Sequence, residues 1–231
     1  MRVERRARLI PYKDDNPTHS FPYVTIGIII VNVIVFLWEI TSRSGIKEIT
    51  YSYGAIPHSI LTFEAKQPIN PAITIFSSMF MHGGFFHLGG NMLYLWIFGN
   101  NIEDRMGPGR FIVFYLFCGV FAAYAHALTD PLSTIPMIGA SGAVSGVLGA
   151  YLLLFPRAMV STLIFLGFFI TTVRIPALIV IGFWAIIQFL NGLIGAGLHE
   201  GGGVAWFAHI GGFLIGLATI KLWLPRRTKH W

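Results

Sequence analysis

The sequence predicts an all-α, polytopic membrane protein with six transmembrane helices, and three observations carry this prediction. Hydrophobic residues make up 55% of the 231 residues and charged residues only 11%, whereas soluble domains carry about 25% charged residues. Six long uncharged stretches follow one another along the chain, and about 20 apolar residues suffice to cross a bilayer. The lysines and arginines gather between alternate stretches. This composition excludes a water-soluble globular fold and intrinsic disorder.

The uncharged stretches place the six helices along the chain. We expect them over residues 22–41, 87–105, 109–128, 141–156, 176–195 and 205–224. The apolar segment between Arg157 and Arg174 is short for a seventh span, and it is interpreted as an interfacial segment or loop. The first helix is not read as a signal peptide, because its apolar region is too long and no small-residue cleavage site follows Trp38. The long, semi-apolar first loop, about 42–85, is expected to lie partly in the outer leaflet.

The basic residues orient these spans. Four basic clusters lie before the first helix, between the second and third, between the fourth and fifth, and after the sixth. With six spans, all four fall on one side, which the positive-inside rule assigns to the cytoplasm. We therefore expect a cytoplasmic tail over 1–21, a membrane domain over 22–224 and a cytoplasmic tail over 225–231. The net charge of +6 therefore reflects the orientation of the protein in the membrane, and no nucleic-acid partner is predicted. The expected location is a bacterial or archaeal cell membrane.

Ser141 is the first candidate for chemistry, because it stands where a glycine-bracketed loop, Gly139-Ala140-Ser141-Gly142, becomes the fourth helix. The first N–H groups of a helix have no partner within the helix. Such a site can bind an oxyanion while it presents a hydroxyl. The alternative is structural, since serine is a common N-cap and small residues pack membrane helices.

His209 lies near the start of the sixth helix, and a neutral imidazole there could accept a proton from a serine. The alternative is a histidine that bonds a neighbouring helix. Gly212 and Gly216 form a small-residue face on the sixth helix, and Gly142 and Gly146 form one on the fourth. Two such faces permit close helix contact, so Ser141 and His209 are predicted to be neighbours.

The second helix carries two further polar candidates, His87 and Asn91, which are four residues apart and share a face. A histidine and an amide near a serine could donate hydrogen bonds to a developing oxyanion. The alternative is interhelical hydrogen bonding. The cluster Glu103-Asp104-Arg105 at the end of this helix is interpreted as structural or interfacial, and Gln188 is interpreted as a packing residue.

Other classes of site lack their sequence patterns. There is a single cysteine, Cys118, and no His-Glu-x-x-His motif, so no metal site is predicted. A phosphate-binding Gly-rich loop is also missing, and no cofactor is expected. A transporter or channel would show charged residues deep in the spans or inverted repeats, and the sequence shows neither.

Taken together, these residues resemble the rhomboid family of intramembrane serine proteases. Four elements match in the order that the family has them, and the resemblance covers about residues 20–224. They are His87-x-x-x-Asn91, Glu103-x-Arg105, Gly139-Ala140-Ser141-Gly142 and Ala208-His209-x-x-Gly212-x-x-x-Gly216. The family implies a rhomboid-like six-helix bundle and an endopeptidase that hydrolyses peptide bonds in or near transmembrane segments.

The resemblance also implies roles for the residues. Ser141 is the nucleophile and His209 the general base and then the general acid, with no third acidic member. The backbone N–H groups of Gly139 and Ser141, with the side chains of His87 and Asn91, form the oxyanion hole. The substrates are single-pass or polytopic membrane proteins within the lipid bilayer. The sequence indicates no particular natural substrate, pathway or oligomeric state.

Two positions depart from the family pattern. Many members carry Trp-Arg in the first loop, where this chain has Ile73 and Thr74. Some members stack a tyrosine on the histidine, four residues after the nucleophile, where this chain has Ser145. His209 is therefore expected to pack against a different, unidentified partner.

The length of the fourth helix predicts a sunken site. A helix over 141–156 would be about 24 Å long, shorter than a hydrocarbon core of about 30 Å. Ser141 would lie below the outer surface, in a pocket open to the non-cytoplasmic side. The alternative function is a non-catalytic rhomboid-like protein that binds transmembrane clients. Such proteins usually lack the serine or the histidine, and this chain has both.

Overall fold

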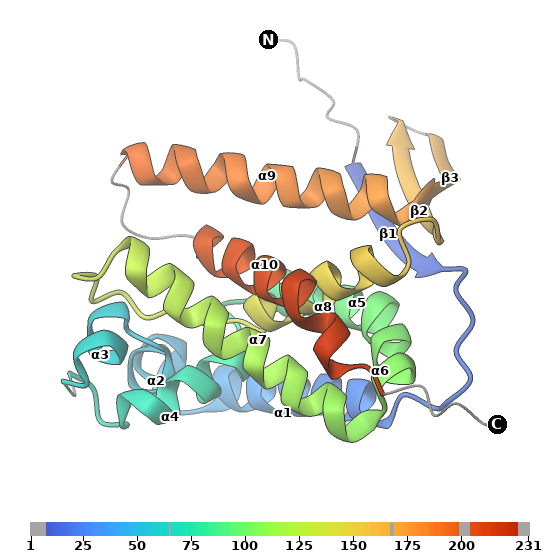
Figure 1. Cartoon of the computed structure of the whole chain (residues 1–231). Helices are drawn as coiled ribbons and strands as arrows, with labels where there is room; N and C mark the ends of the chain where they lie inside the picture. The colour runs from blue at the N-terminus through green and yellow to red at the C-terminus, as the bar shows by residue number, and fades with distance from the viewer. Residues whose placement is uncertain (1–7, 65, 167–168, 199–203, 226–231) are drawn as a thin grey trace, which may run out of the picture.

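The computed structural model describes residues 8–64, 66–166, 169–198 and 204–225. Its elements, drawn in Figure 1, follow the chain in this order: β1 (Arg8–Asp14), α1 (Tyr23–Thr41), α2 (Gly45–Tyr53), α3 (Pro57–Thr62), α4 (Pro71–Ser77), the 3₁₀ helix η1 (Ser78–Phe80), α5 (Phe85–Tyr94), the π-helical segment η2 (Leu95–Gly99), α6 (Asn100–Met106), α7 (Pro108–Thr129), α8 (Ser141–Leu154), β2 (Met159–Leu166), β3 (Phe169–Pro176), α9 (Ala177–Leu198) and α10 (Trp206–Trp223). The last residues of the predicted C-terminal tail and the first seven of the N-terminal one lie outside the described residues.

The long apolar stretches form helices close to the predicted bounds. Within the described residues, α1, α7, α9 and α10 are long and apolar enough to cross a membrane, which is what an integral membrane protein requires. The predicted second helix is one continuous helical run made of α5, η2 and α6. The predicted fourth helix is α8, which has only 14 residues.

The centre of the bundle is α8, and every residue from Gly142 to Tyr151 is buried. Glycines let α10 pack directly against its backbone. A Cβ atom added at Gly212 would overlap the carbonyl oxygen of Gly142, and one added at Gly216 would overlap that of Gly146. Small residues at such contacts allow the backbones of membrane helices to approach closely. The predicted contact between the two glycine faces is confirmed.

A three-stranded antiparallel sheet corrects the all-α prediction. Its order is β1-β2-β3, with Leu9 opposite Ile164 and Thr162 opposite Val173. The segment between Arg157 and Arg174, predicted to be an interfacial segment or loop, supplies β2 and most of β3. Each strand satisfies the backbone N–H and C=O groups of its neighbour, which a loop of this apolar composition could not do alone. The predicted N-terminal tail thus contains a strand.

The sheet lies at one end of the bundle, and α2, α3 and α4 lie at the other (Figure 1). We call these the sheet end and the loop end. The chain enters α1, α7 and α9 from the sheet end and enters α8 and α10 from the loop end (Figure 1). Ser141 and His209 are near the starts of α8 and α10, so both lie toward the loop end of their helices.

Side-chain hydrogen bonds of residues 14–16 connect the sheet to the helices. The buried carboxylate of Asp14 accepts hydrogen bonds from the Tyr151 hydroxyl at 2.6 Å and from Asn101 Nδ2 at 2.8 Å. The Asp15 carboxylate accepts from the backbone N–H of Met159 at 2.8 Å, and Asn16 Nδ2 donates to Asn101 Oδ1 at 2.6 Å. These bonds join β1 to α6, α8 and the start of β2.

The end of the second helical run, Glu103-Asp104-Arg105, was predicted to be structural or interfacial, and its first residue has a structural role. The buried Glu103 carboxylate accepts from the backbone N–H groups of Val24 and Thr25 and from the Thr25 hydroxyl, at 2.7–2.9 Å. It thereby caps the first turn of α1, where a negative charge also complements the helix dipole. Arg105 lies 5.8 Å from the centre of the Phe155 ring.

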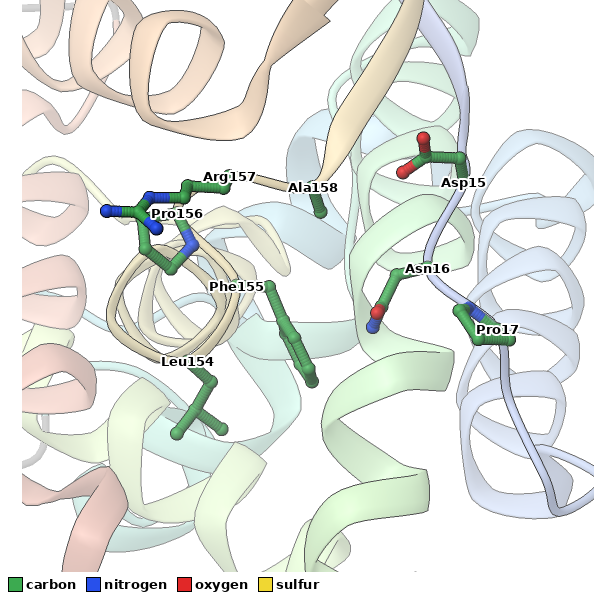
Figure 2. Close-up of a pocket in the computed structure, with 8 residues that line it drawn as sticks. All are labelled: Asp15, Asn16, Pro17, Leu154, Phe155, Pro156, Arg157 and Ala158. Carbon is green, nitrogen blue, oxygen red and sulfur yellow. The ribbon is translucent and has the colours of Figure 1, made fainter.

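An open cavity of about 510 Å³ lies at the sheet end, between the segment that follows β1 and the last turn of α8. In Figure 2, Asn16 points toward Phe155, and the Arg157 side chain turns away from Asp15. This cavity lies at the opposite end of α8 from Ser141, so it takes no part in the site described below.

The Asp14 contacts give a first testable prediction. Asp14→Ala is expected to lower the free energy of unfolding by about 1–3 kcal/mol, because it leaves the Tyr151 hydroxyl and the Asn101 amide without their acceptor. Unfolding in detergent, followed by circular dichroism, measures this. An Asp14→Ala variant as stable as the wild type would show that the carboxylate does not fasten the sheet.

Burial also raises the pKa of Asp14 above its ordinary value, against the opposing effect of the Tyr151 hydrogen bond. A raised carboxyl pKa means that the folded state favours the protonated form. The pH-dependent part of the Asp14 contribution is then greatest below the ordinary pKa and is lost as the pH rises through the raised one. Asp14→Asn should abolish this part of the pH dependence of unfolding.

Candidate active site

Ser141 is the first residue of α8. It follows a short loop that contains a glycine in the left-handed region of backbone conformation. Gly139 has a φ of 127°, which residues with a side chain rarely adopt. Its backbone N–H donates to the carbonyl oxygen of Ser78 at 2.8 Å. This bond ties the loop to η1 and engages the N–H that was predicted to serve the oxyanion hole. Because this N–H already has an acceptor, it is not among the donors proposed for the oxyanion below.

Gly139 also has a steric role in the site. A Cβ atom added there would lie 2.7 Å from His87 Nε2 and 3.5 Å from Ser141 Oγ. Only a glycine leaves room for the imidazole ring at this point. His87 thus lies against the loop immediately beside the Ser141 hydroxyl.

The Ser141 hydroxyl and the His209 ring form a hydrogen bond. The distance between Ser141 Oγ and His209 Nε2 is 2.7 Å, and His209 is buried. The close contact between α8 and α10 at Gly142 and Gly212 brings the two side chains together, since Gly212 lies one turn of helix after His209. The proximity predicted from the glycine faces is confirmed.

The surroundings of His209 come from α9 and from the first turn of α10. On the side away from Ser141, His209 Nδ1 lies 2.7 Å from Gln188 Oε1. The rings of Trp184 and Trp206 lie with their centres 6.2 and 6.0 Å from that of His209. These two tryptophans are the packing partners of His209 that the sequence did not identify.

The sequence suggests that Gln188 is a packing residue and does not indicate its contact with His209. The available signal was its place in the apolar α9, where a polar side chain needs a partner inside the bundle. The partner itself could not be read from the sequence, because α9 is apolar on all faces apart from this residue and Asn191.

The predicted second helix carries two hydrogen-bond donors, of which His87 lies beside the loop that precedes Ser141. The backbone N–H of Gly83 donates to His87 Nδ1 at 3.3 Å, so a neutral His87 carries its proton on Nε2, the atom that faces Gly139. Asn91 lies one turn further along α5, and its buried Nδ2 has no partner among the described residues. An unpaired buried donor is costly unless an acceptor arrives.

Ser145 does not share this environment. It is buried, and its hydroxyl donates to the carbonyl oxygen of Ser141 at 2.6 Å, one turn back along α8. Ser141 itself lines a cavity of about 40 Å³, together with several small residues, among them Gly119, Ala122 and Ala208. It has room for at least one water molecule.

The first loop is held without the Trp-Arg pair. The backbone N–H of His82 donates to the buried carboxylate of Glu39, near the end of α1, at 3.1 Å. Gln67 Nε2 donates to the carbonyl oxygens of Tyr51, Ser52 and Gly54 at 2.8–3.2 Å. A backbone bridge between Ala55 and Met137 joins this loop to the one before α8.

Comparison with known proteins agrees with this architecture. The Rhomboid domain family matches residues 70–226, which include the second helical run, α8 and α10. The chain belongs to the rhomboid family. As a rhomboid, it is an integral membrane protein of mostly helical fold, in a family that includes serine proteases acting on membrane proteins.

Three relatives of this rhomboid illustrate the range of the family. Rhomboid protease GluP of Bacillus subtilis is 28% identical over 96% of the chain and 38% of its own length. Rhomboid protein 1, mitochondrial, of Saccharomyces cerevisiae is 36% identical over 43% of the chain and 30% of its own length. The human presenilin-associated rhomboid-like protein, mitochondrial, is 30% identical over 63% of the chain and 36% of its own length. The chain spans well under half the length of these relatives.

Proposed function

We propose that this rhomboid is an active intramembrane serine endopeptidase that uses a dyad of Ser141 and His209. The observation that supports the proposal most directly is the 2.7 Å hydrogen bond between Ser141 Oγ of the buried helix α8 and Nε2 of the buried His209 on α10. A serine hydroxyl becomes a nucleophile when an adjacent base can take its proton. The buried position of His209 beside two tryptophans lowers the local dielectric, which strengthens its electrostatic interaction with Ser141.

The reaction follows from this geometry. Ser141 Oγ attacks the carbonyl carbon of the scissile bond and passes its proton to His209 Nε2. His209 then gives that proton to the amide nitrogen as the C–N bond breaks, which leaves an ester on Ser141. A water molecule attacks the ester and gives a proton to His209 Nε2. His209 returns a proton to Ser141 Oγ as the acid product leaves. No cofactor or metal enters the scheme.

The oxyanion of the tetrahedral intermediate needs donors aimed at it. We propose His87 Nε2–H, Asn91 Nδ2–H and the backbone N–H of Ser141 for this role. The last group is one of the first N–H groups of α8, which have no acceptor within the helix. The unpaired Asn91 amide suits an acceptor that forms only during the reaction.

The same proposal includes the orientation of the chain. We infer six membrane crossings, made by α1, the α5–α6 run, α7, α8, α9 and α10, with both termini in the cytoplasm and the sheet end on that side. A helix of 14 residues is about 21 Å long, which is too short to span the hydrocarbon core. Ser141 then lies below the outer surface, where transmembrane segments of single-pass or polytopic substrates can reach it after local unwinding.

A fluorophosphonate probe tests the proposal in the intact membrane protein. The probe should form a covalent adduct on Ser141, located by mass spectrometry of the labelled peptide. Wild-type protein reconstituted in liposomes should also cleave a model transmembrane substrate that has small, helix-breaking residues near the outer interface. Ser145→Ala is the matched control, and it should keep both labelling and cleavage because the Ser145 hydroxyl faces the α8 backbone.

Two outcomes would overturn this assignment. An adduct on Ser145 would remove Ser141 as the nucleophile. Binding of the model substrate with neither cleavage nor labelling would favour the alternative of a non-catalytic rhomboid that retains transmembrane clients.

A further inference from the structure

We propose that Gln188 of α9 is the positioning residue for His209, and that the dyad is complete only while α9 is docked against α10. This inference rests on the proposed function, since it concerns the same histidine. Gln188 would then be a third member of the site, in the role that an acidic residue has in a catalytic triad.

The hydrogen bonds of His209 are the first argument. A neutral imidazole has one N–H donor and one acceptor nitrogen. For Nε2 to accept the Ser141 proton, the ring must carry its own proton on Nδ1. Gln188 Oε1, an acceptor 2.7 Å from Nδ1, selects this tautomer. A neutral amide can therefore orient the base and fix its tautomer, as the carboxylate does in triad enzymes.

The place of Gln188 on α9 is the second argument. The inward stripe of α9 consists of Ala177, Ile181, Trp184, Gln188 and Gly192, which follow at helical spacing. Of these, Trp184 and Gln188 both contact His209. A single helix face thus supplies both the packing partner and the hydrogen-bond partner of the catalytic ring.

The contact between α9 and α10 is close but narrow. A Cβ atom added at Gly192 would lie 3.3 Å from Ile210 and 3.4 Å from the Cβ of Trp206, so only a glycine fits there without a shift. The neighbours of Gln188 on the outer side, such as Phe183 and Phe189, are more than half exposed. In Figure 1, α9 lies along the edge of the bundle, with α10 next to it. Displacement of α9 would therefore remove Gln188 and Trp184 from His209 together.

The test compares three variants in liposomes with the model transmembrane substrate. Gln188→Leu should lower kcat by about 10- to 100-fold, as removal of the orienting partner of a metal-bound histidine does, and leave KM nearly unchanged. Gln188→Glu keeps an acceptor oxygen at the same reach and should restore most of the activity. Asn191→Leu, which removes another amide from the same helix, should behave as the wild type.

A substitution elsewhere on the inward face of α9 tests the docking of this helix. Gly192→Leu should push α9 away from Trp206 and lower kcat as Gln188→Leu does. The double variant should be no slower than the slower single variant, because both changes break the same contact. Thermal unfolding in detergent identifies any variant that has lost its fold. If Gln188→Leu is unfolded, the kcat of Gln188→Glu relative to the wild type tests the role of Gln188.

The outcomes separate this inference from the proposed function. Wild-type protein that neither cleaves nor takes the fluorophosphonate would refute the proposed function itself. Active wild type with an unchanged Gln188→Leu, a change in KM alone, or no restoration by Gln188→Glu would overturn the role of Gln188. Additive losses in the double variant would overturn the link to α9 docking.

Discussion

Replacing His209 with Ala is expected to lower kcat/KM for a transmembrane substrate by about 10³-fold or more. The imidazole is the only base in hydrogen-bond contact with Ser141 Oγ among the described residues. Without it, the hydroxyl must lose its proton to water that the buried site admits poorly. In serine proteases, loss of the base costs about as much as loss of the whole catalytic unit, because its members act together.

Ser141→Ala should cause a loss of the same size, and the double variant should be no worse than either single one. Cleavage in liposomes, followed by gel shift of the substrate, measures all three. Ser145→Ala serves again as the control, with activity near that of the wild type. Undiminished cleavage by either single variant would refute the dyad.

The helices were predictable because each is a long apolar run. The runs from Tyr23 and Pro108 form helices within a residue or two of the predicted bounds. The glycine pairs on the fourth and sixth helices were also informative, since their spacing implies close backbone contact wherever the two faces meet. Ser141 and His209 lie at the ends of those faces, and so their contact followed from a packing argument.

The sheet and the role of Gln188 were not predictable in this way. An apolar run such as that from Met159 to Leu166 does not reveal whether it is a strand or a helix, because alternation is lost when both faces are apolar. Its partner β1 lies more than 140 residues away in the chain, too far for any local pattern to indicate. For Gln188, the stripe on α9 was visible, but the rotation that turns it toward His209 is fixed only by tertiary contacts such as Gly192 against Trp206.

The glycines that hold α8 against α10 are expected to tolerate no larger side chain. Gly216→Leu is expected to prevent folding, because even a Cβ atom at this position would overlap the carbonyl oxygen of Gly146. Backbone atoms cannot move aside as a flexible side chain can, so the two helices must separate. Gly216→Ala adds only that Cβ atom, and it should lower the free energy of unfolding by more than the roughly 1–3 kcal/mol that overpacking a core usually costs, because the overlap is with backbone.

Gly27 in α1 is the matched control, since a Cβ atom added there meets nothing within 4 Å. Gly27→Ala should match or exceed the wild type in stability, by up to about 1 kcal/mol, because alanine is the better helix former. Unfolding in detergent should therefore rank the variants in opposite directions for the same chemical change. Since Gly216 lies two helical turns beyond His209, a Gly216→Ala variant that folds but cleaves slowly would show that the spacing of α8 and α10 sets the distance between Ser141 and His209. A Gly216→Leu variant with unchanged stability would contradict the packing on which the dyad depends.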